Sequence, residues 1–262
     1  MLLIEQGALR FFQFEGFDSA TLAHGIFTRH GGVSPQPFAS LNMSVSTGDT
    51  RENVRRNVTL AFEALKRDPA SCADLWQVHS ARVVVADEPN GTREHLGQAD
   101  ALITDRPEVS LLLRFADCVP ILLFDPRRPA VAVVHAGWRG TLKKAVKATV
   151  EAMAERYGTR PGELLAGIGP GIGPCHYAVG PEVVDQTRRV FQGAADSLLL
   201  AKNGGYHLDL WAANQASLIE AGVEQIEMAE LCTVCRSQDF FSHRATGGVT
   251  GRFGGLIGLR KS

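Results

Sequence analysis

The sequence predicts an α+β or mixed α/β fold, a multilayer sandwich of mixed β-sheets flanked by helices. Apolar, strand-like runs alternate with polar turns from about residue 74 to residue 136. The run from Ala130 to His135 is almost continuously apolar, which is typical of a strand covered on both faces. Amphipathic stretches in the C-terminal half predict helices that pack on these sheets.

The N-terminal part is predicted to contain a strand, a long loop and a helix. Residues 9–17 are rich in aromatic side chains and are consistent with an edge strand. Residues 24–43 carry Gly31-Gly32 and two prolines, so we expect a loop that its side chains must hold in place. Asp49 or Thr50 then caps a helix, whose apolar stripe comprises Val54, Val58, Ala61, Phe62 and Leu65.

The rest of the chain is predicted to alternate strands and helices. Strand-like runs lie at residues 74–80, 81–87, 99–105, 109–117, 120–126 and 130–136. One long amphipathic helix should follow His135, with Val146, Val150 and Met153 on one stripe, and end at Gly158. Beyond it we expect a strand within residues 163–168, helices over 181–191 and 207–222, and a closing strand near 255–259.

Bulk properties favour an ordinary globular protein. Because we find no linker, repeat or break in composition, we expect the 262 residues to form a single domain over 1–262. The net charge of -1 argues against nucleic acid or an anionic membrane as the main partner. No run approaches the roughly 20 apolar residues of a membrane helix, and the first residues do not form a signal peptide. We therefore expect a cytoplasmic protein, monomeric or weakly dimeric.

The five cysteines predict a reducing compartment rather than a disulfide framework, because their number is odd and the chain is large. Cys232 and Cys235 form a CxxC pair, but the sequence offers no second CxxC to complete a structural zinc site. We interpret them as two ordinary thiols in a loop, and we assign no role to Cys175.

Three residues at predicted strand ends form the most informative set. His79, Cys118 and His135 lie in the phrases WQVHS, FADCVP and VVHAGWRG. Two imidazoles and one thiolate suit a zinc ion that keeps a fourth position open for water or substrate. Their spacing matches no compact metal-binding motif, so a buried histidine and an inert core cysteine are alternatives from the residues alone.

The order of short motifs resembles one protein family over roughly residues 20 to 260. The motifs are TRHGGVSPQPFASLNMS, QVHS, ADALIT, ADCVPILLFD, VAVVHAGWRGT, GIGPGIGPCHYAVG and FFSHRA followed by TGR. That family goes by the names laccase-domain or polyphenol oxidase protein, peptidoglycan editing factor and purine nucleoside phosphorylase. The pairing of ADC with HAGWRG is highly specific for it.

The resemblance implies a zinc site made by His79, Cys118 and His135, with Cys118 catalytic through it. It also implies phosphorolysis of adenosine, inosine, guanosine and methylthioadenosine, with adenosine deamination as a second activity. The expected partners are purine nucleosides and phosphate.

Two further candidates adjoin the ligands in the sequence. Asp117 precedes Cys118 and is placed to orient a ligand or carry a proton, although it could equally cap a turn. Arg139 follows His135 at a strand-to-helix junction, where backbone N–H groups attract anions.

Four more residues are candidates for substrate binding, each with a structural alternative. Arg29 could grip a phosphate or stabilise its loop by a salt bridge. Asn42 and Gln77 could bond a sugar or base, or stabilise turns. Arg244 matches the arginine of the family's FFS-aromatic-R phrase, although His243 replaces the usual tyrosine there.

Two other functions remain open. A His₂Cys set also suits copper, which would fit a laccase-like polyphenol oxidase, but the eight histidines are scattered and include no H-x-H. Alternatively, Cys118 and His135 could be the nucleophile and base of a hydrolase that edits peptidoglycan precursors.

Overall fold

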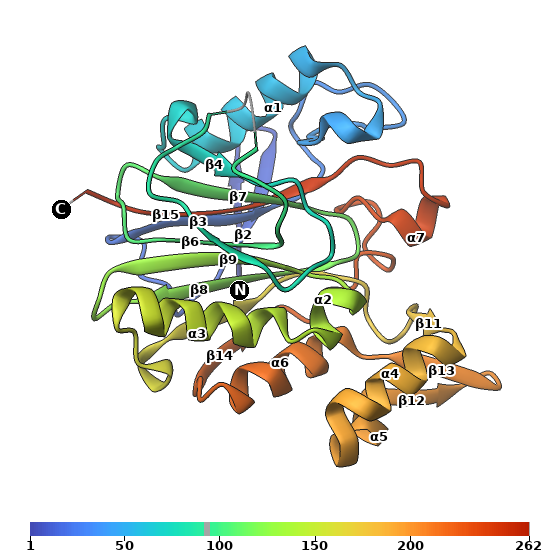
Figure 1. The fold of residues 1–262 in the computed structure, drawn as a ribbon. Helices are drawn as coiled ribbons and strands as arrows, with labels where there is room; N and C mark the ends of the chain where they lie inside the picture. The colour runs from blue at the N-terminus through green and yellow to red at the C-terminus, as the bar shows by residue number, and fades with distance from the viewer. Residues whose placement is uncertain (92–94, 262) are drawn as a thin grey trace.

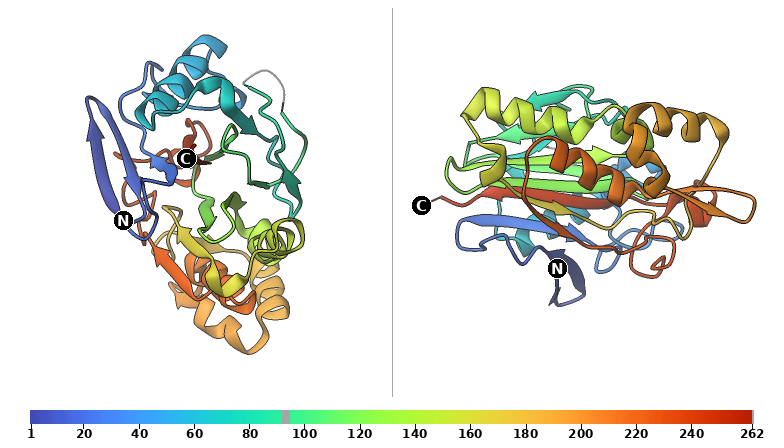
Figure 2. Two further views of the ribbon diagram at one scale, coloured as in Figure 1. Left: turned by 90° about the vertical axis from the view of Figure 1, so that its left-hand side faces the viewer. Right: turned by 90° about the horizontal axis from the view of Figure 1, so that it is seen from below.

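Two stacked mixed sheets form the centre of the molecule, with helices on both outer faces (Figures 1 and 2). The computed structural model describes residues 1–91 and 95–261. The first sheet has the order β1-β2-β3-β15-β7-β4, and the second β14-β10-β8-β9-β6-β5. Most neighbours are antiparallel, whereas β4–β7, β5–β6 and β10–β14 are parallel. The predicted sandwich of mixed sheets flanked by helices is confirmed.

The strands of the two sheets come from all parts of the chain. The first sheet contains β1 (Leu2–Gln6), β2 (Leu9–Gln13), β3 (Leu22–Phe27), β4 (Cys72–Asp74), β7 (Ser110–Phe115) and β15 (Phe253–Leu259). The second contains β5 (Val83–Val85), β6 (Ala101–Thr104), β8 (Val119–Asp125), β9 (Ala130–Ala136), β10 (Leu165–Ile168) and β14 (Gln225–Met228).

Strand β9 shows why its sequence is apolar throughout. Val131 and Val133 belong to the cluster between the two sheets, whereas Ala132 and Val134 belong to the cluster under the helices. Successive side chains of a strand point to opposite faces, so a strand with both faces covered must be apolar at every position. The prediction for residues 130–135 is confirmed.

The helix α1 (Arg51–Ala64) covers the first sheet, and α3 (Ala145–Tyr157) and α6 (Leu210–Glu220) cover the second (Figure 1). The side chain of Thr50 accepts a hydrogen bond from the backbone N–H of Asn53 and caps α1, as predicted. Lys144 lies between α2 (Trp138–Leu142) and α3 with φ 58°, in the left-handed region. The single long helix predicted after His135 is therefore wrong, because this residue breaks it into two.

Two strand predictions also need correction. β2 pairs with β1 as well as β3, so β1 and not the aromatic-rich segment forms the edge. In the run predicted at residues 74–80, the strand β4 ends at Asp74 and only an isolated bridge joins Trp76 to Gln98. The segment up to residue 80 is instead a loop that carries His79.

A smaller lobe lies at one corner of the molecule (Figure 1). It contains a three-stranded sheet and two helices: β11 (Ala178–Val179), α4 (Pro181–Phe191), α5 (Ala195–Leu198), β12 (Leu199–Lys202) and β13 (Gly205–Leu208). The remaining short helices are η1 (Val45–Thr47), η2 (Pro69–Ser71), η3 (Pro161–Glu163), η4 (Gln192–Ala194) and α7 (His243–Thr246). Among the described residues, none of the helices is long and apolar enough to span a membrane.

His24 on β3 gives the fold a predicted sensitivity to acid. Its ring is 1% exposed and packs against Phe14 and Phe17, and its Nε2 lies 2.9 Å from the backbone N–H of Phe14, which donates to it. Burial lowers the pKa of His24 from 6.5 to about 4. Unfolding exposes a ring that binds a proton more readily, so stability is full above pH 6.5 and falls as the pH drops towards 4.

We expect this single group to remove about 3 kcal/mol of unfolding free energy between those pH values. His24→Gln should flatten that part of the pH profile, measured by denaturant unfolding. Phe17→Leu is the control, since it removes packing without a titrating group and should lower stability equally at each pH. An unchanged profile in His24→Gln would contradict the assignment.

Candidate metal centre and its cavity

His79, Cys118 and His135 come together at one end of the second sheet. β8 and β9 are antiparallel, with Pro120 paired to His135, so Cys118 just before β8 lies beside the end of β9. His79 reaches the same place from the loop before β5. The potential ligand atoms of the three residues lie within 4.8 Å of one another, and Cys118 Sγ is 3.8 Å from His79 Nε2. The three residues thus form one group that can hold a metal ion.

Asp100, immediately before β6, fixes this group. Its carboxylate accepts a hydrogen bond from His135 Nδ1 at 2.8 Å and is 0% exposed. It also accepts from the backbone N–H groups of His79 at 2.9 Å and Ser80, and from Ser80 Oγ at 2.8 Å. One buried carboxylate therefore orients the ring of one candidate ligand and the loop of a second.

This arrangement suits metal binding for two reasons. When Nδ1 donates to Asp100, Nε2 is the nitrogen of His135 that can bind a metal once its proton is lost, as in histidine ligands with a carboxylate partner. His79 has φ 57°, an unfavourable conformation for a residue with a side chain, which the bonds to Asp100 support. The donor set of one sulfur and two imidazoles is one that zinc accepts.

Gly137 leaves no space for a side chain next to the ligands. A Cβ atom placed there would lie 2.7 Å from Cys118 Sγ and 3.1 Å from His79 Cδ2. Any other residue at this position would push the sulfur or the ring away. The glycine of the HAGWRG motif is therefore required by the close approach of the backbone to the metal group.

The neighbouring charges favour the ligand form of the thiol. Burial alone would raise the pKa of Cys118, but His135 and His79 lower it to about 6. Burial would lower the pKa of His135, but Cys118 and Asp100 raise it to about 9. Burial opposes ionisation of Asp100, yet bonds from His135 and Ser80 lower its pKa to about 2. The sulfur is thus held next to groups that stabilise a thiolate, the form that binds metals.

The three residues line a cavity of about 730 Å³. Its walls include the loop at residues 43–46, the start of α1, α2 and α7. Arginines dominate its charged lining: Arg51, Arg55, Arg114, Arg139, Arg244 and Arg252, against the carboxylates of Asp74 and Asp117. The protein has a net charge of only -1, so this positive charge is a local feature of the cavity that favours an anionic ligand.

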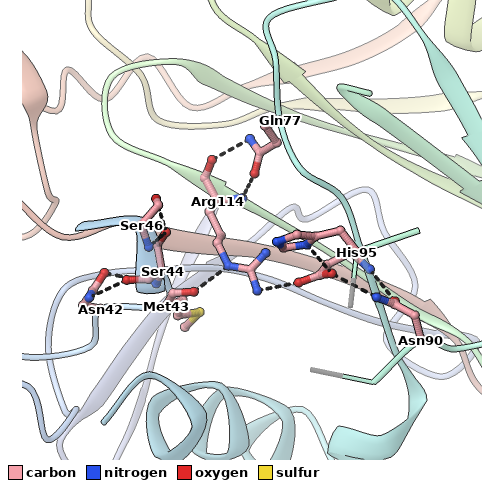
Figure 3. Close-up of polar contacts among 9 residues, drawn as sticks. Asn42, Met43, Ser44, Ser46, Gln77, Asn90, His95 and Arg114 are labelled. Carbon is pink, nitrogen blue, oxygen red and sulfur yellow. Dashed lines mark hydrogen bonds and ion pairs between the residues drawn. The ribbon is translucent and has the colours of Figure 1, made fainter. Parts of the chain in front are cut away.

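Arg114 on β7 connects the two sides of one cavity wall (Figure 3). Its Nε donates to the carbonyl oxygen of Met43, and its Nη2 donates to Asp74 at 2.6 Å. Asp74 also bonds His95 Nδ1 at 2.8 Å. The guanidinium therefore ties the loop at residues 43–46 to the last residue of β4, and holds both against the cavity.

Three of the five predicted substrate-binding residues line the cavity, and two do not. Gln77, Arg139 and Arg244 line the cavity. Arg29 and Asn42 are absent from its lining and make internal bonds instead. Arg29 donates to the carbonyl oxygens of Ala39 and Ser237, and the buried Asn42 donates to the Ser44 carbonyl oxygen, Thr47 and Asp49. These bonds hold the loop of residues 29–49 in place.

Gln77 lines the cavity, but its amide is engaged with the backbone. Its Nε2 donates to the carbonyl oxygen of Arg114 at 2.8 Å, and its Oε1 accepts from the Arg114 N–H at 2.9 Å (Figure 3). The side chain thereby holds the loop that carries His79 against β7.

Asp117 lies next to Cys118 and is held from two sides. Its Oδ1 accepts from Thr233 Oγ1 at 2.6 Å, and its Oδ2 accepts from the backbone N–H of Arg244 at 2.6 Å. Its φ of 84° is in the left-handed region. The carboxylate joins three segments of chain at the cavity wall.

Two residues that hold the candidate site together, Asp100 and Arg114, were missed in the sequence. Asp100 stands in the ADALIT motif, which was noted only as a mark of resemblance. Arg114 interrupts the apolar run of β7, and a lone charge in a buried strand was the available signal. Neither position reveals its partner without the fold, because Asp100 and His135 are far apart in the chain.

The fold and the site define an α+β protein with a His₂Cys group in an arginine-lined cavity. The family model described as multi-copper polyphenol oxidoreductase laccase matches residues 23–260. The chain belongs to this family of enzymes, so the predicted resemblance is confirmed.

Similar proteins carry the name of a nucleoside-cleaving enzyme. A protein of Bacteroides thetaiotaomicron named purine nucleoside phosphorylase is 35% identical over 242 residues, covering 89% of this chain and 90% of its own. Purine nucleoside phosphorylase YlmD of Geobacillus stearothermophilus is 39% identical over 246 residues, covering 90% of both.

Two solved structures agree over almost the whole chain. The crystal structure of YlmD from Geobacillus stearothermophilus has a TM-score of 0.91 at 36% identity and covers 99% of both chains. The hypothetical protein YfiH of Bacillus licheniformis has a TM-score of 0.91 at 34% identity and covers 98% of both.

Replacing the orienting carboxylate tests the metal group. In Asp100→Asn, the amide should lose the charge that supports His135 and present N–H groups to backbone donors. We expect metal affinity to fall about 10- to 100-fold, measured by competition with a chromophoric chelator. The control is Asp125→Asn, a buried carboxylate that accepts backbone bonds from Arg127 and Arg128 at the other end of β8. Equal losses in both variants would show a general folding defect instead.

Proposed function

We propose that the protein is a zinc-dependent purine nucleoside phosphorylase, acting on adenosine, inosine, guanosine and methylthioadenosine, with adenosine deaminase activity at the same site. The observation that carries the proposal is the single cavity that joins the His₂Cys group to a lining rich in arginine. The names of the relatives support it. The proposed location is the cytoplasm.

His79, Cys118 and His135 are the proposed zinc ligands, and Asp100 holds two of them in place. A zinc ion bound there would supply a Lewis acid that polarises an oxygen or nitrogen of the substrate. All three candidate ligands line the cavity. A purine nucleoside can therefore approach the group directly.

Phosphorolysis requires two charges to be stabilised at once. A phosphate oxygen bonds to C1′ of the ribose while the bond from C1′ to the purine nitrogen breaks, and the electron pair leaves with the purine. Positive charge develops on the ribose and negative charge on the base. Arginines of the cavity such as Arg139 and Arg244 are suited to hold the phosphate next to C1′.

The remaining candidates support these groups. Asp117 is the proposed proton-transfer residue, because it lines the cavity beside Cys118 and its carboxylate is fixed by Thr233 and Arg244. Gln77 is proposed to act through His79, whose loop it holds. For Arg29 and Asn42 the internal bonds favour a role in shaping the loop over direct contact with substrate.

Product analysis tests the reaction. After incubation with adenosine and phosphate, mass spectrometry should detect adenine and ribose 1-phosphate. Without phosphate, deamination should give inosine alone. If neither product forms with zinc-loaded protein, the proposal fails.

Removing the central ligand tests whether one site performs both reactions. Cys118→Ala should lose bound zinc and lower phosphorolysis and deamination together by at least about a hundredfold. Cys72→Ala is the matched control, since Cys72 is a buried cysteine of β4 outside the cavity. Phosphorolysis retained in Cys118→Ala would refute the shared site.

Two alternatives have specific support. The family's description favours copper, and a His₂Cys group accepts it; metal analysis of protein prepared without added copper separates this function from ours. The hydrolase alternative is supported by the contact of Cys118 with His135 and by the bond from His135 to Asp100, an arrangement that resembles a nucleophile, base and orienting acid. A covalent acyl adduct on Cys118 would favour it, whereas protection of the thiol by zinc would favour ligation.

A further inference from the structure

A second group of metal-binding side chains lies outside the His₂Cys group. Cys175 and His176 follow β10, and Cys232 and Cys235 follow β14. Their potential ligand atoms all lie within 4.8 Å of one another. The sequence interpretation of Cys232 and Cys235 as ordinary thiols missed this, because the complementary pair is Cys175-His176 rather than a second CxxC.

The sheet topology explains why the two pairs meet. β10 and β14 are parallel neighbours, with Leu165 paired to Gln225 and Ile168 to Met228. Parallel strands end at the same edge of a sheet, so the segments that follow them leave side by side. Backbone bonds then join these segments, from Thr233 N–H to the Gly171 carbonyl oxygen at 3.0 Å and from Gly171 N–H to the Leu231 carbonyl oxygen at 3.2 Å.

The separations match those of ligands around one tetrahedral ion. His176 Nδ1 lies 3.3 Å from the sulfur of Cys175, 3.7 Å from that of Cys232 and 3.4 Å from that of Cys235. The sulfurs of Cys175 and Cys235 are 3.6 Å apart. Tetrahedral zinc with bonds of about 2.3 Å to sulfur and about 2.0 Å to nitrogen would place sulfurs about 3.8 Å apart and sulfur and nitrogen about 3.5 Å apart.

The surrounding backbone also suits a thiolate. The N–H of Gly173 points at the Cys232 sulfur at 3.3 Å. A Cβ atom at Gly173 would lie 2.7 Å from Trp211 and 3.2 Å from the Cβ of Cys232, so the backbone approaches the sulfur closely only because this residue is glycine. Such N–H···S bonds stabilise negative charge on a sulfur ligand.

We propose that Cys175, His176, Cys232 and Cys235 form a second, structural metal site that binds zinc. Three thiolates and one imidazole select a soft or borderline ion, and four protein ligands leave no position for substrate. This site therefore differs in kind from the three-ligand group, and the proposal does not depend on the function proposed above.

The second site would stabilise the wall of the cavity. Thr233 lies between Cys232 and Cys235 and donates to Asp117, the neighbour of Cys118. On the other side, Arg244 Nη1 donates to the carbonyl oxygen of His176 at 3.1 Å. A metal ion that joins the two loops would thus hold both Asp117 and Arg244 where they line the cavity.

Metal counting tests the proposal. Protein reconstituted with zinc under reducing conditions and then desalted should contain about two zinc ions per chain by inductively coupled plasma mass spectrometry. Cys235→Ser and Cys118→Ala should each contain about one, and the double variant about none. The buried Cys72→Ala is the matched control and should retain both ions. About one ion in the unaltered protein, unchanged in Cys235→Ser, would overturn the proposal.

A measurement on the unaltered protein tests the site even if a variant fails to fold. Cys175 and Cys235 are exposed, so without a metal they should react rapidly with an alkylating reagent. We expect zinc to slow their alkylation at least about tenfold and a chelator to restore it, mapped by peptide mass spectrometry. Rapid alkylation in the presence of zinc, or a mass deficit of two hydrogens from a disulfide between Cys175 and Cys235 that persists under reducing conditions, would contradict the site.

Discussion

The bond network of Asp100 is the constraint on which the candidate active site depends. A buried carboxylate is costly unless every oxygen is satisfied, and here ring and backbone donors from His79, Ser80 and His135 satisfy it. The same bonds place a strained His79 and select the tautomer of His135. The hydrogen bonds of Asp100 therefore contribute both to the stability of the fold and to the geometry of the candidate ligands. A substitution that breaks them affects both.

Local patterns predicted the elements with strong periodicity. The α1 cap at Thr50, the doubly buried β9 and the helix over residues 181–191 followed from side-chain spacing alone. The break at Lys144 did not, because the left-handed turn there depends on packing between α2, α3 and α6 rather than on a glycine or proline signal. The edge strand was misassigned because pairing partners are not visible in a single segment.

The candidate site was likewise predictable from the sequence only in part. The three candidate ligands could be named because recognisable motifs surround them, but spacing alone left ordinary core residues as alternatives. Their partner Asp100 and the group around Cys232 arise from contacts between distant segments. For Arg29 and Asn42 the sequence left substrate binding and loop stabilisation open, and their internal hydrogen bonds favour loop stabilisation.

The register of β8 against β9 has a consequence for which changes the chain can tolerate. Cys118 and His135 meet because Pro120 is paired with His135, and every side chain of both strands is buried. Deleting one residue inside either strand would exchange its side chains between the two packed faces, which are filled by side chains of different size, and would separate Cys118 from His135. The turn at residues 126–129 lies at the other end of the hairpin, so its length affects neither the packing of the strands nor the approach of Cys118 to His135. Insertions should therefore accumulate in that turn during evolution, while the lengths of the two strands stay fixed.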